Sequence, residues 1–196
     1  MACESACTLQ LLLMHGLAEL PIDTAAYDLR IGRTPGEGDF ESGNLRVQLE
    51  SGFEIRQYSN IDLQMIVSSS DYVRQGWIDE GDDPAEVDEI LPSVYPQLRK
   101  RIQKKIDIIG RFPETYHRIP RDSNWTDIVL MLKDCYIVGC DYQSNAGTSH
   151  RILITRELAD DEYEIYEPSV GVERRKGVED LAVNLLPGAE GYRLSA

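Results

Sequence analysis

The second half of the chain contains three consecutive strand-like segments, and this pattern constrains the fold most. The segments are residues 135–142 (CYIVGCDY), 149–157 (SHRILITRE) and 161–168 (DEYEIYEP). Asp160 with Asp161 can supply a turn between the last two. Short consecutive strands joined by turns predict a mostly antiparallel sheet in this half of the chain.

Patterns typical of helices dominate the first half instead. Residues 4–15 are apolar on nearly every side, which predicts a deeply buried helix that Gly16 can end. Residues 53–59 alternate like a strand, and the Gly- and Pro-rich residues 33–43 predict a loop. We expect further helices over residues 21–32 (capped by Asp23 or Thr24), 44–52, at least the first half of 60–78 (capped by Ser59 or Asn60), 93–110, 123–134 and 178–186. We also expect a closing strand over residues 191–196.

Helices followed by strands are the order of an α+β fold. A length of 196 residues and a hydrophobic content of 42% allow one domain with its own core. We therefore expect a single domain over residues 1–196. Within it we expect a helical lobe over about residues 1–133 and a sheet lobe over about residues 134–196.

The net charge of −14 argues against nucleic acid and anionic membranes as partners, because both would be repelled. The most acidic stretch, residues 79–92, predicts a solvated loop and helix face, and the basic helix over residues 93–110 offsets its charge. No apolar run is long enough to span a membrane. The apolar residues 9–17 lack the basic flank and the cleavage site of a signal peptide, so we expect a cytoplasmic protein. The sequence does not indicate an oligomeric state.

Four cysteines are present: Cys3, Cys7, Cys135 and Cys140. Four are too few for a disulfide scaffold in a chain that can build a core, which favours a reducing compartment. Their spacings differ from the paired C-x2-C pattern of tetrahedral zinc sites. We therefore expect neither a metal nor a cofactor.

Cys3 is the cysteine best placed for chemistry. A helix N-terminus lowers the pKa of a thiol, and a neighbouring histidine lowers it further. Cys7 lies one turn farther along an apolar helix, where core packing is its expected role. His15 lies too far along the same helix to reach Cys3, and His117 lies in a polar segment that predicts a surface loop.

His150 is the histidine best placed to act as the base. It opens a strand directly after a glycine-bearing loop, and Glu167 ends the next strand. A hairpin would bring Glu167 back toward His150, where its carboxylate could orient the imidazole. By pleat alternation Glu162 and Glu164 face the other way. An exposed histidine at a strand end is the alternative.

Two motifs resemble the papain-like cysteine peptidases related to bacteriocin (double-glycine) leader peptidases. Residues 3–16 (CESACTLQLLLMHG) are similar to the nucleophile helix of that family, with Ala6 and Cys7 as helix residues. Residues 149–168 are similar to its second motif, a histidine that opens a strand and an acidic residue before proline that ends the next. Residues 51–59 (SGFEIRQYS) resemble the stand-alone branch of the superfamily.

The resemblance implies a papain-like fold in which a buried nucleophile helix packs on an antiparallel sheet. It implies Cys3 as nucleophile, His150 as base and Glu167 as the orienting carboxylate. The implied activity is hydrolysis of an amide bond in a peptide or protein substrate without a cofactor. The acidic surface suits a basic substrate.

The sequence departs from the family pattern in three ways. Glu4 replaces the usual glycine after the nucleophile, and a carboxylate there raises the pKa of a neighbouring thiol. The acidic partner is Glu167 rather than aspartate. The family also has an oxyanion glutamine before the cysteine, whereas only Met1 and Ala2 precede Cys3 here. An acyltransferase or deamidase with the same triad, a non-catalytic peptide-binding module and a structural domain with buried cysteines therefore stay open.

Overall fold

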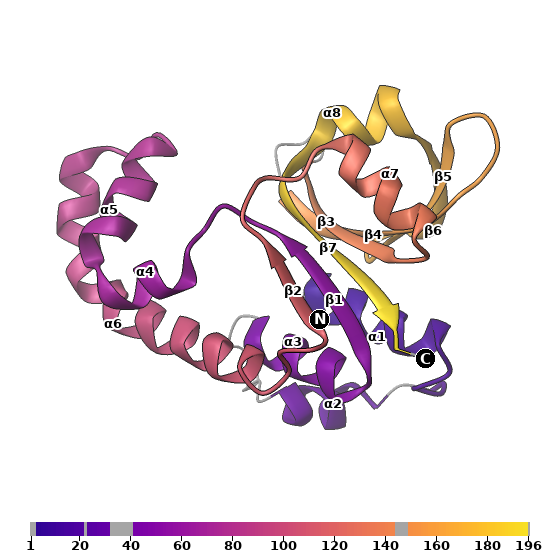
Figure 1. The fold of residues 1–196 in the computed structure, drawn as a ribbon, viewed down its shortest axis with the longest axis horizontal. Helices are drawn as coiled ribbons and strands as arrows, with labels where there is room; N and C mark the ends of the chain where they lie inside the picture. The colour runs from indigo at the N-terminus through magenta and orange to yellow at the C-terminus, as the bar shows by residue number, and fades with distance from the viewer. Residues whose placement is uncertain (1–2, 22, 32–40, 144–148, 196) are drawn as a thin grey trace. The chain divides into compact units, whose positions relative to one another are not determined.

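The computed structural model describes residues 3–21, 23–31, 41–143 and 149–195, apart from the side chains of Cys3 and Glu41 (Figure 1). Its contacts divide the chain into two compact units, which are described separately here. The sheet unit comprises Met1–Asn60 and Glu114–Ala196, and the helical unit comprises Ile61–Pro113. The single domain with a boundary near residue 133 stays a prediction. The predicted loop over residues 33–43 lies mostly outside the described residues.

Within the described residues, seven strands form one sheet in the order β2-β1-β7-β3-β4-β5-β6. Neighbouring strands are antiparallel except for β1 and β2, which are parallel, and this confirms the predicted α+β class. β7 follows every other strand along the chain, yet it lies between β1 and β3. The strands are β1 (Phe53–Tyr58), β2 (Tyr116–Ile119), β3 (Ile137–Gln143), β4 (Ser149–Glu157), β5 (Glu162–Glu167), β6 (Gly171–Lys176) and β7 (Leu185–Leu194).

One strand prediction was wrong, and another covered only part of the strand that forms. The segment around His117 was expected to be a loop, but it forms β2, because β1 supplies a parallel partner that pairs Arg56 with His117. The predicted surface position of His117 is confirmed, since its side chain is 47% exposed. The closing strand begins at Leu185 rather than near residue 191, because it pairs with both β1 and β3.

The helices of the sheet unit follow the predicted order closely. The apolar helix over residues 4–15 is α1, and it ends where Gly16 adopts a φ of +67°. Asp23 caps α2, since its carboxylate accepts a hydrogen bond from the Ala26 amide. The helices are α1 (Cys3–Met14), α2 (Thr24–Ile31), α3 (Glu41–Glu50), α7 (Trp125–Lys133), the π-helical turn η1 (Gly177–Leu181) and α8 (Ala182–Asn184).

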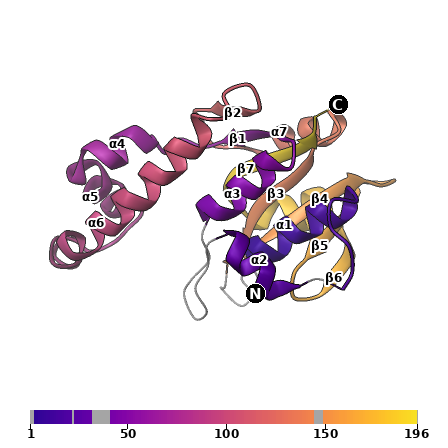
Figure 2. The same ribbon diagram turned by 90° about the horizontal axis from the view of Figure 1, so that it is seen from below.

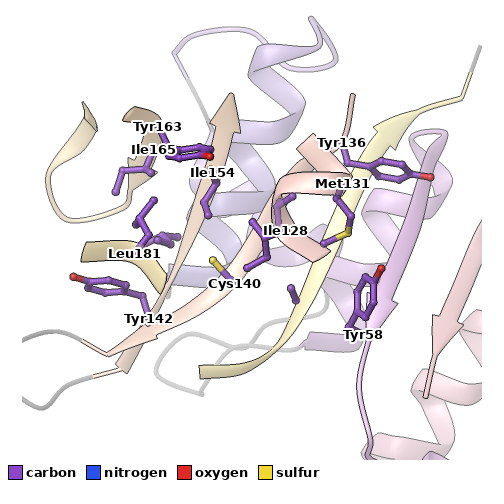
Figure 3. Close-up of a cluster of buried hydrophobic side chains, with 13 residues drawn as sticks. Tyr58, Ile128, Met131, Tyr136, Cys140, Tyr142, Ile154, Tyr163, Ile165 and Leu181 are labelled. Carbon is purple, nitrogen blue, oxygen red and sulfur yellow. The ribbon is translucent and has the colours of Figure 1, made fainter. Parts of the chain in front are cut away.

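Helices cover both faces of the sheet (Figures 1 and 2). On the α7 face, Ile152 and Ile154 of β4 join a buried cluster with Ile128 and Met131 of α7 (Figure 3). Arg151 lies between the two isoleucines in the sequence, so pleat alternation turns its side chain to the other face. We call that other face the α1 face, because α1 packs on β4 and α3 packs on β1 there.

The helical unit has three helices, α4 (Leu63–Ser68), α5 (Ser70–Asp79) and α6 (Pro84–Ile109), around a small core that includes Val73, Val87 and Leu91. The predicted cap at Ser59 or Asn60 was wrong. Asp62 caps α4 instead, because its carboxylate accepts hydrogen bonds from the amides of Gln64 and Met65.

α6 is longer than the basic helix expected over residues 93–110. It starts at Pro84, because Asp83 caps it and a proline at the first helical position has no amide that needs a partner. The helix therefore joins the acidic stretch to the basic one and contains Pro92 and Pro96 in its interior. Among the described residues, no helix combines the length and the apolar character that crossing a membrane requires.

Asp127 anchors the start of α7 and makes stability depend on pH. Asn124 and Asp127 form a capping box, and Arg121 donates to both carboxylate oxygens of Asp127 at 2.6 and 2.7 Å. These hydrogen bonds, chiefly those from Arg121, hold the pKa of Asp127 below its ordinary value. A lowered folded pKa means that the carboxylate contributes its full stability above about pH 4. The contribution is lost as the pH falls through the folded pKa.

We expect Asp127→Asn to lower the free energy of unfolding by about 1–2 kcal/mol at pH 7. The difference from the wild type should shrink as the pH falls below about 4 and through the lowered pKa of Asp127. Urea unfolding between pH 2 and pH 7, followed by circular dichroism, measures it. Asp122→Asn, at an exposed neighbour, is the control and should change little. A difference for Asp127→Asn that is independent of pH would contradict the assignment.

Candidate active site

α1 begins at Cys3, so the predicted nucleophile stands at the N-terminus of a helix, although its side chain lies outside the described residues. Cys7 is 2% exposed, and its Sγ donates to the carbonyl oxygen of Arg151 at 3.5 Å. This contact confirms Cys7 as a core residue. It also places the first turns of α1 against the start of β4, because Arg151 is the third residue of β4 and follows His150 in the sequence.

The other two cysteines differ in burial. Cys140 is 1% exposed, and burial raises the pKa of its thiol to about 12, so it is not a thiolate at neutral pH. Cys135 is exposed and reduced, in a turn with a φ of +64°. In the described part of the chain, no three His, Cys, Asp or Glu side chains gather in a way that could hold a metal ion.

The hairpin of β4 and β5 brings His150 and Glu167 together, as the spacing predicts. The Nε2 atom of His150 lies 3.5 Å from Oε1 of Glu167, and their side chains are 23% and 8% exposed. This distance fits an ion pair when the imidazole is protonated, but the geometry is not that of a hydrogen bond. The buried Nε2 therefore has no hydrogen-bond partner in the described region. A buried ring nitrogen without a partner is rare and marks a candidate functional group.

Two residues that the sequence did not predict fix the carboxylate of Glu167. Arg175 of β6 donates to Oε2 at 2.7 Å, and Ser169 donates to Oε1. Arg175 also donates to Glu173. Because both oxygens of Glu167 have donors, the carboxylate is held in one orientation toward His150.

Tyr142 of β3 completes this cluster. Its ring centroid lies 5.8 Å from that of His150, and the guanidinium of Arg175 lies 4.9 Å from the ring centre of Tyr142. The hydroxyl of Tyr142 donates to Asp180 at 3.0 Å. His150, Glu167, Arg175 and Tyr142 therefore form a closed ring of contacts at the start of β4, and this ring limits the movement of the imidazole.

The pleat of β4 sets which face His150 occupies. His150 shares the α7 face with Ile152, whereas Arg151 points to the α1 face. The helix that carries Cys3 therefore packs on the face opposite the His150 side chain. For Cys3 and His150 to meet, their side chains would have to reach each other beyond the edge where β4 starts, at Ser149.

A partly buried polar network lies on the α1 face beside the first turn of α1. Arg151 is 16% exposed and donates to Glu190 of β7 and, at 3.0 Å, to the hydroxyl of Tyr192. Gln57 of β1 donates to the same Glu190 at 2.6 Å and accepts a hydrogen bond from Tyr116 of β2. One chain of hydrogen bonds thus links four strands, β2, β1, β7 and β4, across the sheet.

Arg151 also interacts with Glu4, the residue that follows Cys3. Burial opposes the charge of Arg151, but Tyr192, Glu190, Asp141 and Glu4 together hold its pKa well above the ordinary value. The guanidinium therefore offsets the negative charge of Glu4. This reduces the effect on a thiolate at Cys3 that the sequence predicts for a neighbouring carboxylate.

His15 and His117 lie apart from this cluster. His15 packs edge-on against Phe53 at 5.2 Å between ring centroids, and burial lowers its pKa. His117 lies 3.9 Å from Glu54. His150 is thus the histidine that the structure places beside the orienting carboxylate.

The paired imidazole and carboxylate can accept and return a proton, which is the base function of a nucleophilic site. Arg175 and Ser169 could not be assigned from the sequence, because their contacts depend on the register of the β5–β6 hairpin. A scan against protein-family models and a search of curated proteins each found no match to this chain.

Proposed function

We propose that this chain is a papain-like cysteine hydrolase that cleaves an amide bond in a peptide or protein through Cys3, His150 and Glu167. The observation that carries the proposal is the 3.5 Å separation between Nε2 of His150 and Oε1 of Glu167. The α+β order and the position of Cys3 at the start of α1 support it further. The net charge of −14 favours a basic substrate.

The reaction follows from the groups in place. Because Nε2 of His150 faces Glu167, Nδ1 is the ring nitrogen that accepts the Cys3 thiol proton. The thiolate sulfur attacks the carbonyl carbon, and the C–N bond breaks as His150 returns the proton to the leaving amine. Water, deprotonated by His150, then hydrolyses the thioester, which releases the acid and restores the thiol. Glu167 stabilises the imidazolium in both steps.

Thiol reactivity tests the proposal without a known substrate. We expect iodoacetamide to modify Cys3 at pH 6.5 about 10–100 times faster than the exposed Cys135 of the same molecule, because an activated thiol remains a thiolate below pH 8. Mass spectrometry of timed peptide digests gives both rates. Cys135 is the internal control, and Cys3→Ala removes the fast site.

His150→Gln should lower the rate at Cys3 at least about tenfold and leave the rate at Cys135 unchanged. The same variants should lose cleavage of a mixed peptide library that the wild type cleaves. Equal rates of iodoacetamide modification at Cys3 and Cys135 in the wild type would refute the proposed hydrolase activity.

A non-catalytic peptide-binding module of the same fold is the second candidate. The observation that favours it is the position of His150 on the α7 face, opposite the face on which α1 packs. Library peptides retained by both the wild type and Cys3→Ala, with no cleaved product, identify this alternative. An acyltransferase or deamidase would give a fast Cys3 thiol but different products.

A further inference from the structure

One exposed side of α6 is acidic near the N-terminal end of the helix and basic near the C-terminal end. Glu86 and Glu89 lie in the N-terminal half, and Lys100, Arg101 and Lys104 lie in the C-terminal half. All five side chains are exposed. Within the described residues, none of the five makes an ion pair. They contrast with Asp88 of the same helix, whose carboxylate is bound by Arg74 at 2.5 Å.

These charges belong to a single stripe along the helix. Six of its positions (86, 90, 93, 97, 100 and 104) recur at alternating intervals of four and three residues, which keeps them on one side of a helix, and residues 89 and 101 lie at the borders of that side. Every member of the stripe is exposed, including the apolar Ile90, which is 49% exposed. We define the α6 stripe as Glu86, Glu89, Ile90, Ser93, Gln97, Lys100, Arg101 and Lys104.

The charges of the α6 stripe are complementary to those of a second stripe that runs in the opposite direction. Tyr95 lies midway between Glu86 and Lys104, and also midway between Glu89 and Arg101. An antiparallel copy centred on residue 95 would therefore place each acidic residue opposite a basic one, and Ser93 opposite Gln97. Glu86 and Lys104 lie about 27 Å apart along a helix, so the contacts would extend over most of its 26 residues.

The two interior prolines are compatible with this pairing. Pro92 and Pro96 remove amide donors from the helix, and Figure 1 shows α6 changing direction partway along its length. At about 100° of rotation per residue, both prolines lie to one side of the stripe. The helix therefore bends within the plane of the stripe, and not toward or away from a partner that faces it. Two bent helices can then stack face to face about a two-fold axis, with the acidic arm of each on the basic arm of the other.

We propose that the α6 stripe is a docking surface for a second copy of this chain, in an antiparallel two-fold dimer. Such a contact is isologous and closes on itself, so it gives dimers rather than filaments. The net charge of −14 on each copy opposes association at long range. At about 0.1 M salt, distant repulsion is screened and close opposite charges still attract.

Charge reversal tests the proposal in both directions. Glu86→Lys with Glu89→Lys makes the stripe basic throughout, and Lys100→Glu with Arg101→Glu and Lys104→Glu makes it acidic throughout. Each set alone should weaken self-association at least about 100-fold, because like charges then face each other. The two proteins mixed should form a one-to-one heterodimer, and the chain with all five changes should dimerise again.

Sedimentation velocity of the full chain at about 0.1 M salt, from micromolar to several hundred micromolar protein, measures these equilibria. Arg99→Glu with Arg111→Glu is the matched control, since both residues are exposed and lie outside the stripe. It should leave the dimer intact. A wild type that stays monomeric over the whole range overturns the proposal. So does a dimer that survives both reversals, or a reversed pair that fails to associate with each other.

Discussion

Arg151→Met is expected to lower the free energy of unfolding by about 3 kcal/mol, because it removes the guanidinium that pairs with Glu190, whose side chain is only 15% exposed. The hydrogen bond from Arg151 to Tyr192 is lost as well, and the neutral donors Gln57 and Tyr192 cannot replace the positive charge of the guanidinium beside Glu190. Urea unfolding at pH 7, followed by tryptophan fluorescence and circular dichroism, measures the change.

The same strand supplies the control. Arg156 is 64% exposed and pairs with Glu164 at 2.8 Å, so Arg156→Met should cost less than about 1 kcal/mol. Combining Arg151→Met with Glu190→Gln should recover part of the loss, because the second change removes the unpaired charge. If Arg151→Met and Arg156→Met cost the same, the network does not have the role assigned to it.

Gly43→Ala should lower the free energy of unfolding by about 3 kcal/mol, at the upper end of overpacking effects. Gly43 lies in α3 against the last residue of α2, and an added Cβ would overlap the carbonyl oxygen of Ile31. Backbone atoms cannot move aside as a side-chain tip can, so α2 and α3 would have to separate. Thermal and urea unfolding both report the loss.

Gly76→Ala is the matched control for this substitution. Gly76 lies in α5, and an added Cβ there meets no atom within 4 Å. Alanine favours a helix over glycine by about 0.8–1 kcal/mol, so this variant should be as stable as the wild type or slightly more so. Equal losses from Gly43→Ala and Gly76→Ala would show that α2 and α3 do not touch in the way described.

Local patterns predicted the elements whose signals are local. The helix over residues 4–15, the paired strands around Asp160 and Asp161, and the cap at Asp23 each follow from neighbours in the sequence. Both aspartates adopt a φ of 59° at the turn, as a short polar side chain permits.

Elements that depend on distant partners were not predictable in this way. β2 has no strand pattern of its own and forms because β1 lies beside it. α6 continues past Pro92 and Pro96, although prolines in a sequence predict that a helix ends. The exposed position of both prolines allows the helix to bend there rather than stop.

The candidate site divides along the same line. His150 and Glu167 could be paired from the sequence, because one hairpin separates them. Arg175 and Tyr142 reach them only through the registers of β6 and β3, which no local pattern determines. Pleat alternation predicts that His150 and Ile152 share one face of β4. It does not show whether α1 covers that face or the opposite one.

The inner position of β7 has a consequence for how the chain acquires its structure during synthesis. Until residues 185–194 have emerged from the ribosome, β1 and β2 share no backbone hydrogen bonds with β3, β4, β5 and β6. The nascent sheet is therefore two separate pieces, each with an open edge that can pair with other strands. Arrival of the last strand joins the pieces and closes both inner edges in one event.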